Sequence, residues 1–103
     1  MSITNSTLTD SVAAEIYTSA GNSAVTTAYL CNKTASAVLV NVFVAPAGEV
    51  ASGNNIIYSN LSIASNDTYV MEAERLLFNN AGYIYANASA ADSVVATISF
   101  TSI

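Results

Sequence analysis

Hydrophobic and polar residues alternate along short segments of this 103-residue chain, and Gly, Asn, Asp and Pro residues separate these segments. Alternation with a period of two is typical of β-strands that place one face on a core. The pattern predicts about eight short strands at a spacing of roughly ten residues. We expect strands at 12–19, 23–32, 37–45, 55–60, 61–64, 67–71, 82–89 and 94–100.

The segment 37–45 gives the clearest strand signal. Val38, Val40, Val42 and Val44 share one face, and the intervening positions from 39 to 43 form the other. Branched valine side chains favour the pleated surface of a sheet. Both faces are largely apolar, so we expect this strand to lie inside a sheet rather than at its edge.

The same alternation assigns faces in two other segments. In 23–32 it groups Val25, Thr27, Tyr29 and Cys31 on one face, opposite Ala24, Thr26, Ala28 and Leu30. In 82–89 it groups Ile84, Ala86 and Ala88 on one face, opposite Tyr83, Tyr85 and Asn87. If the face of Ile84 meets the core, the two tyrosines stand on an outer face.

Many short strands joined by turns indicate an all-β fold, an antiparallel β-sandwich. The length fits a single domain over residues 1–103, and we interpret residues 1–11 as an N-terminal arm. The one alternative to strand structure is a short helix within 71–78, where Met, Glu, Ala, Arg and Leu are good helix formers. The long loop 45–55 is interpreted either as a docking arm or as a simple connection.

Charge is scarce: the net charge is −5, and Lys33 and Arg75 are the only cations. Binding of nucleic acid or anionic lipid needs clusters of Lys and Arg, so we expect neither partner. No apolar run approaches the roughly 18 residues of a transmembrane helix. Residues 1–17 lack a basic start and an apolar middle, so we expect no secretory signal peptide. Roughly a third of the chain is Ser, Thr and Asn, which suits a surface covered by neighbouring subunits.

The residues offer little catalytic chemistry. The chain contains no histidine, which excludes Ser-His-Asp and Cys-His arrangements. Cys31 is expected to be a small buried apolar residue, and Lys33 lies in a polar turn. Asp67, Glu72 and Glu74 supply oxygen ligands for a cation, but their spacing matches no EF-hand loop. We therefore predict no catalytic, metal or cofactor site and no enzymatic activity.

Two groups of residues are candidates for an interface. Asp67, Glu72, Glu74 and Arg75 place four charges within the stretch NDTYVMEAERLLF, residues 66–78. This cluster is interpreted as a corner between strands that is either solvated or in contact with a partner. The second group is Tyr83 with Tyr85, because exposed tyrosines bind sugars or anchor protein partners.

Several motifs, spread over residues 15–100, carry a family resemblance. They are Tyr17-Thr18, Cys31-Asn32, Asn66-Asp67-Thr68, the Leu-x-x-Asn-x-Gly turn ending at Gly82, Ile84, Ala86, Ala88 with Ser89, and a closing valine-rich strand. In this order they resemble small β-sandwich structural proteins of tailed bacteriophages. Many members carry Gly-Asp in the last turn, whereas Tyr83 follows Gly82 here. No role of that aspartate is carried over.

The resemblance implies an immunoglobulin-like or jelly-roll-like sandwich in a virion, made in the host cytoplasm. Its expected role is head decoration, or a neck or tail component, that associates with itself, for example as a trimer, and with other capsid or tail proteins. The alternative is a carbohydrate- or receptor-binding module that uses Tyr83 and Tyr85. The resemblance transfers no site residues.

Overall fold

The computed structural model describes residues 2–10, 12–71 and 76–103, and in these ranges it contains nine β-strands and no helix. The all-β prediction is confirmed. The strands are β1 (Ser2–Thr7), β2 (Ala14–Thr18), β3 (Ser23–Asn32), β4 (Val38–Ala45), β5 (Ile56–Ile63), β6 (Thr68–Met71), β7 (Leu76–Phe78), β8 (Tyr83–Ala88) and β9 (Val94–Ser102).

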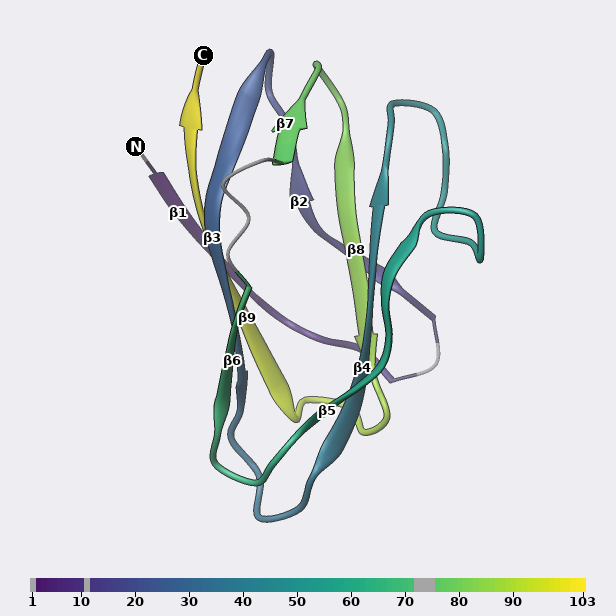
Figure 1. Cartoon of the computed structure of the whole chain (residues 1–103), viewed down its shortest axis with the longest axis vertical. Helices are drawn as coiled ribbons and strands as arrows, with labels where there is room; N and C mark the ends of the chain where they lie inside the picture. The colour runs from purple at the N-terminus through teal and green to yellow at the C-terminus, as the bar shows by residue number, and fades with distance from the viewer. Residues whose placement is uncertain (1, 11, 72–75) are drawn as a thin grey trace.

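The strands form two antiparallel sheets that pack as a sandwich (Figure 1). One sheet, here the β1 sheet, has the order β1-β9-β3-β6, with β7 also paired to β3. The other, the β2 sheet, has the order β2-β8-β4-β5. If β6 and β7 count as two parts of one strand, this is the eight-stranded order of a jelly roll. An immunoglobulin-like sandwich pairs its first two strands, whereas β1 and β2 lie in different sheets.

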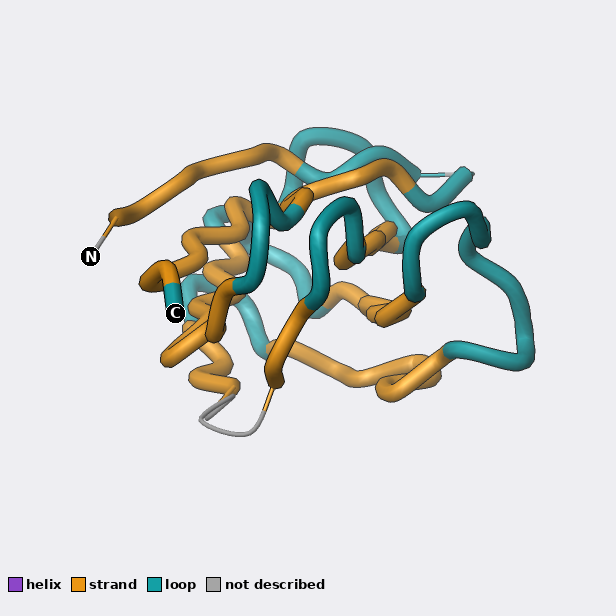
Figure 2. Tube along the Cα trace, turned by 90° about the horizontal axis from the view of Figure 1, so that it is seen from above, coloured by secondary structure: helices purple, strands orange, loops and turns teal. Residues whose placement is uncertain are grey.

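Apolar side chains from both sheets fill the space between them. β4 contributes Val38, Val40 and Val42, each at most 4% exposed, as the alternation predicted. β4 pairs with β8 on one side and β5 on the other, so the prediction that it lies inside a sheet is also confirmed. Figure 2 shows β1 running along one border of the molecule, with loops over the strand ends.

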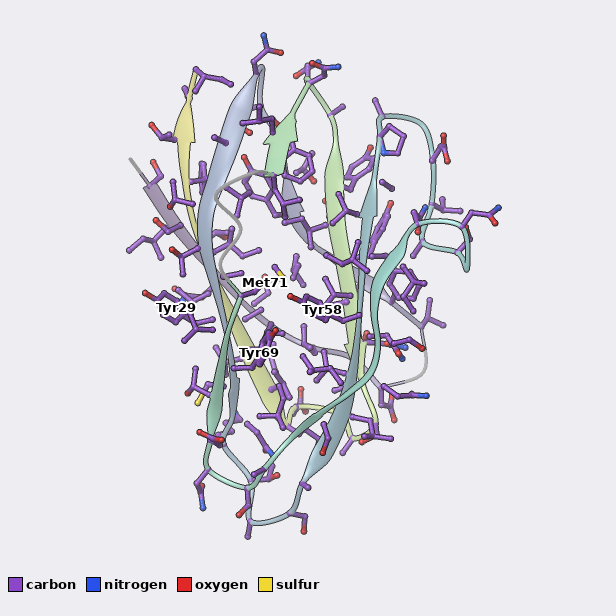
Figure 3. All side chains as sticks on the ribbon, viewed as in Figure 1. Tyr29, Tyr58, Tyr69 and Met71 are labelled. Atoms are coloured by element: carbon purple, nitrogen blue, oxygen red, sulfur yellow. The ribbon has the colours of Figure 1, made fainter. Side chains whose placement is uncertain are left out.

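A β-bulge makes the predicted faces of β3 wrong beyond Val25. The pairing with β9 shifts register between Val25 and Thr27. A bulge adds one residue to a strand, which moves every later side chain to the opposite face. Val25 and Leu30 therefore both lie in the core, while Tyr29 is 43% exposed. Figure 3 shows Tyr29 on the outer side of β3, away from the core.

The N-terminal arm is a second correction. Residues 2–7 form strand β1, which pairs with β9 over six consecutive positions, from Ser2 with Phe100 to Thr7 with Val95. The weak apolar pattern of this segment hid the strand, because only Ile3 in it is a large apolar residue. After β1 the chain crosses between the sheets: the backbone N–H of Leu8 donates to Val94 of β9, and the carbonyl of Thr9 accepts from Ala88 of β8.

Two further predictions change at strand boundaries. The segments 55–60 and 61–64 form one strand, β5, which bends at Asn60, where φ is 56°. The side-chain oxygen of Asn41 accepts the backbone N–H of Asn60 at 2.8 Å, which satisfies the donor displaced by the bend. In 71–78, Leu76–Phe78 is a strand rather than part of a helix, and residues 72–75 lie outside the described residues.

Buried polar contacts tie the strands together at both ends of the sandwich. At one end the fully buried Asn32 holds two turns: its side-chain nitrogen contacts the carbonyl oxygens of Ser36, Ile63 and Ala64 at 2.8–3.1 Å. Its side-chain oxygen accepts from the N–H and the hydroxyl of Thr34 at 3.0 and 2.7 Å. Every hydrogen-bonding position of this amide is thus occupied.

At the other end, three hydroxyl groups link β2 to β3. The hydroxyl of Ser23 lies 2.6 Å from those of Tyr17 and Ser19, and Ser19 donates to the carbonyl of Gly21. The ring of Tyr17 also packs against Phe78 and Phe100, with ring centroids 5.6 and 4.9 Å apart. Since Tyr17 belongs to the β2 sheet and its partners to the β1 sheet, this contact joins the two layers.

Tyr58 of β5 and Tyr69 of β6 close one open side between the sheets (Figure 3). Their rings meet edge to face at 5.5 Å, and their hydroxyl oxygens are 3.2 Å apart. The hydrogen bond with Tyr69, partial burial and the adjacent phenol together raise the pKa of Tyr58 above 10. Tyr58 therefore keeps its hydroxyl proton at neutral pH.

Candidate functional site

The candidate site lies on the outer face of the β2 sheet, where β8 places its two tyrosines. Ile84 and Ala86 are fully buried, and Tyr83 and Tyr85 point the other way and are half-buried. This agrees with the faces predicted from alternation. The two rings stack with centroids 5.5 Å apart and an interplanar angle of 28°. Residues two apart on a strand share a face, which is why these rings meet.

Strand pairing places further aromatic and amide groups beside the tyrosines. Phe43 of β4 is opposite Tyr85, and Asn41 is opposite Asn87. The side-chain nitrogen of Asn41 donates to the side-chain oxygen of Asn87 at 3.0 Å. This bond fixes the orientation of both amides and leaves the nitrogen of Asn87 available as a donor. The strip thus combines ring surface with oriented polar groups.

A groove of about 610 Å³ lies over this strip. Its floor is formed by Phe43, Tyr85 and Asn87, and residues 12–13 and 50–53 line it on either side. The volume is within the range of roughly 300–1,000 Å³ that small-molecule sites occupy. An open groove with aromatic and amide surface and no charged lining residue suits a neutral polar ligand better than an ion.

Asn55 organises the loop that forms one side of the groove. Its side-chain oxygen accepts the backbone N–H of Ser52 at 3.0 Å, and its side-chain nitrogen donates to the carbonyl of Val50 at 2.8 Å. The carbonyl of Asn55 also accepts the N–H of Val44. These bonds tie the 45–55 loop to itself and to the end of β4, because the Asn side chain replaces backbone partners within the turn.

The electrostatics of the groove favour a neutral Tyr85. Partial burial raises the pKa of Tyr85 above 10, and the neighbouring Tyr83 and Glu15 add to this effect. Glu15 of β2 is opposite Tyr85 in the sheet. Tyr85 therefore carries a hydroxyl proton at neutral pH, which it can donate to an acceptor on a ligand.

The structure brings together only part of the predicted interface set. Tyr83 and Tyr85 lie side by side, but Glu72, Glu74 and Arg75 fall outside the described residues. Asp67, from the same charge cluster, caps its own turn by accepting the N–H of Thr68 through a side-chain oxygen at 2.9 Å. Within the described ranges, no group of three His, Cys, Asp or Glu side chains is arranged to hold a metal ion.

Sequence reasoning missed the contributions of Phe43, Asn87 and residues 50–53. The outward positions of Phe43 on β4 and Asn87 on β8 are visible in the alternation, but the groove also depends on which strands become neighbours and on where the 50–53 loop folds. Cys31 is half-buried on the outer side of β3 rather than fully buried, because the bulge reverses its face. Nothing in the local pattern of residues 23–32 marks that bulge.

Comparison with known protein families, curated proteins and solved structures found no match to this chain. In the described part of the chain, no helix has the length and apolar character needed to cross a membrane.

Proposed function

We propose that this chain is a non-enzymatic structural protein of a tailed-bacteriophage virion, located on the head shell or in the neck or tail. The observation that carries the proposal is the strand order β1-β9-β3-β6 and β2-β8-β4-β5. This jelly-roll order is shared by viral coat domains and by some lectins. The motif resemblance described from the sequence supports the viral member of that pair.

Surface composition gives separate support, which matters because one fold serves many functions. The outward side of the β1 sheet combines Ser, Thr and Asn residues with large exposed apolar side chains and has no charged residue in the described strands. The exposed apolar side chains on it are Ile3, Tyr29, Val70 and Leu77, at 43–69% exposure. Apolar groups rimmed by polar residues mark protein contact surfaces. We assign docking to other capsid or tail proteins to this side.

The proposal predicts that particles purified from the phage culture that produces this chain contain many copies of it. Quantitative mass spectrometry of particles banded on a density gradient measures the copy number against the major shell protein. Val70→Lys should lower incorporation, because a charge on the docking side would lose its water in the contact. Leu39→Lys, a matched change at a 42% exposed residue of the other sheet, should not. Absence of the chain from washed particles would refute the proposal.

The groove supports a second candidate function, binding of a neutral carbohydrate. Tyr85 and Phe43 provide ring surface, and Asn87 and the 50–53 backbone provide hydrogen-bonding groups. Sugars present apolar C–H faces beside hydroxyl groups, so a site for them needs both kinds of surface. This candidate places the activity on the β2 sheet and leaves the outer side of the β1 sheet free.

For this second candidate we expect Tyr85→Ala to abolish glycan binding or weaken it by about tenfold or more, because it removes ring surface and a donor together. Tyr29→Ala, on the opposite sheet, is the matched control and should bind as the wild type does. A glycan array followed by titration calorimetry measures both variants. Failure of the wild-type chain to bind any glycan on the array would rule out the carbohydrate function.

A further inference from the structure

The four sheet edges of the sandwich differ in how open they are to another strand. Natural proteins protect edges with bulges, charges and very short strands. In the β2 sheet, β2 has a register shift between Glu15 and Tyr17 and carries the Glu15 carboxylate. The other edge, β5, has two register shifts against β4 and a left-handed residue at Asn60. Both edges of the β2 sheet are therefore poor templates for strand addition.

Among the described strands of the β1 sheet, only β1 presents a long, regular edge. On the far side, β6 and β7 are short strands of four and three residues. β1 pairs with β9 over six positions without a register shift, and its sequence SITNST has neither charge nor proline. Every protective device seen at the other three edges is missing from β1.

The open hydrogen-bonding groups of β1 can be assigned from its pairing. The N–H of Leu8 donates to Val94 of β9 at 2.9 Å. In an antiparallel ladder, residues that bond to one neighbour alternate with residues that face away from it. Ser2, Thr4 and Ser6 therefore bond to β9, whereas the N–H and C=O groups of Ile3, Asn5 and Thr7 point to the open side. Thr9 continues this alternation. Its carbonyl oxygen points away from β9 and accepts a hydrogen bond from the backbone N–H of Ala88.

We propose that β1 pairs with β1 of a second copy, antiparallel about a two-fold axis through Asn5. In this register Asn5 is opposite Asn5 of the second copy, and Ile3 of each copy is opposite Thr7 of the other. The open backbone N–H and C=O groups of all three residues then form hydrogen bonds between the two copies. The pairing extends the β1 sheet across both copies, with four strands abreast from each. The absence of charge from β1 makes self-pairing free of like-charge repulsion.

The occupant is a second copy because the open groups are symmetric about Asn5, as an isologous two-fold contact requires. A three-fold ring would instead need β1 to pair with a different edge of the next copy. The other described edges are bulged, charged or short, so they do not match it. Exposure agrees with this assignment, since Ile3 is 69% exposed and Asn5 and Thr7 are exposed on the same side.

Introducing a charge at the axis tests the proposal. Wild-type protein should dimerise in analytical ultracentrifugation, and Asn5→Lys and Asn5→Asp should each weaken dimerisation by about tenfold or more, since like charges then meet. An equimolar mixture of the two variants should restore the dimer, because Lys and Asp become opposite only in this register. Ser62→Lys and Ser62→Asp, on the exposed β5 edge, are matched controls that should dimerise like wild type.

A monomeric wild-type protein at about 1 mM, a dimer unaffected by both Asn5 variants, or a mixture that stays monomeric would each overturn the proposal.

Amide hydrogen exchange provides a test that needs no substitution. Exchange at Ile3, Asn5 and Thr7 should slow as protein concentration rises, and exchange that is independent of concentration contradicts the pairing. The inference rests on edge geometry alone. A dimer formed by a chain that is absent from virions would refute the proposed function and leave this inference standing.

Discussion

Replacing Asn32 with aspartate should lower the free energy of unfolding by about 3 kcal/mol or more, because it removes the buried donor that serves three carbonyl groups and leaves a buried carboxylate in its place. Asn32 is fully buried, and its side-chain nitrogen contacts the carbonyl oxygens of Ser36, Ile63 and Ala64. A carboxylate there would face the same oxygens with no proton to donate. Urea denaturation followed by circular dichroism at pH 7 measures the loss.

The effect of Asn32→Asp should also depend on pH. Burial raises the pKa of a carboxyl group above its unfolded value of about 3.9. Such a group is less unfavourable when protonated, so the variant should be closest to wild type near pH 4 and lose stability as pH rises. Asn54→Asp, the same change at an exposed loop position, is the matched control and should differ little from wild type. A loss below about 1 kcal/mol for Asn32→Asp would contradict the role of this amide.

Leu30→Ala should cost about 2–5 kcal/mol of unfolding free energy, whereas Tyr29→Ala should cost about 1 kcal/mol or less. Leu30 is 1% exposed and lies in the core cluster, so its truncation leaves a cavity. Tyr29 is 43% exposed on the outer side of β3, beside Val70 and Thr97. Thermal and urea unfolding of the two variants measure the contrast.

This pair of variants tests the bulge directly, because strict alternation from Val25 places Tyr29 in the core and Leu30 outside. Equal costs, or a larger cost at Tyr29, would show that β3 has no bulge between Val25 and Thr27. Ala28 and Ala24 are less informative for this purpose, since neither side chain is large enough to leave a measurable cavity.

The strands that were predicted well share a strong local signal. β4 and β8 each carry an uninterrupted alternation, and their burial follows it from Val38 to Val42 and from Ile84 to Ala88. β1 was missed because its inward positions, Thr4 and Ser6, are polar, so the segment has no apolar face to detect. Its strand structure depends on pairing with β9 at the other end of the chain, from Ser2 with Phe100 to Thr7 with Val95.

In the candidate groove, too, some features follow from local alternation and others depend on long-range strand pairing. Alternation places Tyr83 and Tyr85 on one face of β8, and Asn41 and Phe43 on the outer face of β4. Which strand lies beside which is set by the closing of the two sheets over a common core, a long-range event that local pattern does not encode. The sides of the groove require, in addition, the turn that Asn55 fixes at residues 50–53.

Composition and alternation alone determined that this chain is all-β, that the valine face of β4 and the Ile84 face of β8 are buried, and that histidine-based catalysis is excluded, because these properties depend on residue type and neighbouring positions. The tertiary structure alone decided the jelly-roll strand order, the reversed faces of β3 after its bulge, and the exposed edge at β1. These depend on hydrogen bonds between segments far apart in the chain, where each strand's position is fixed by its partners.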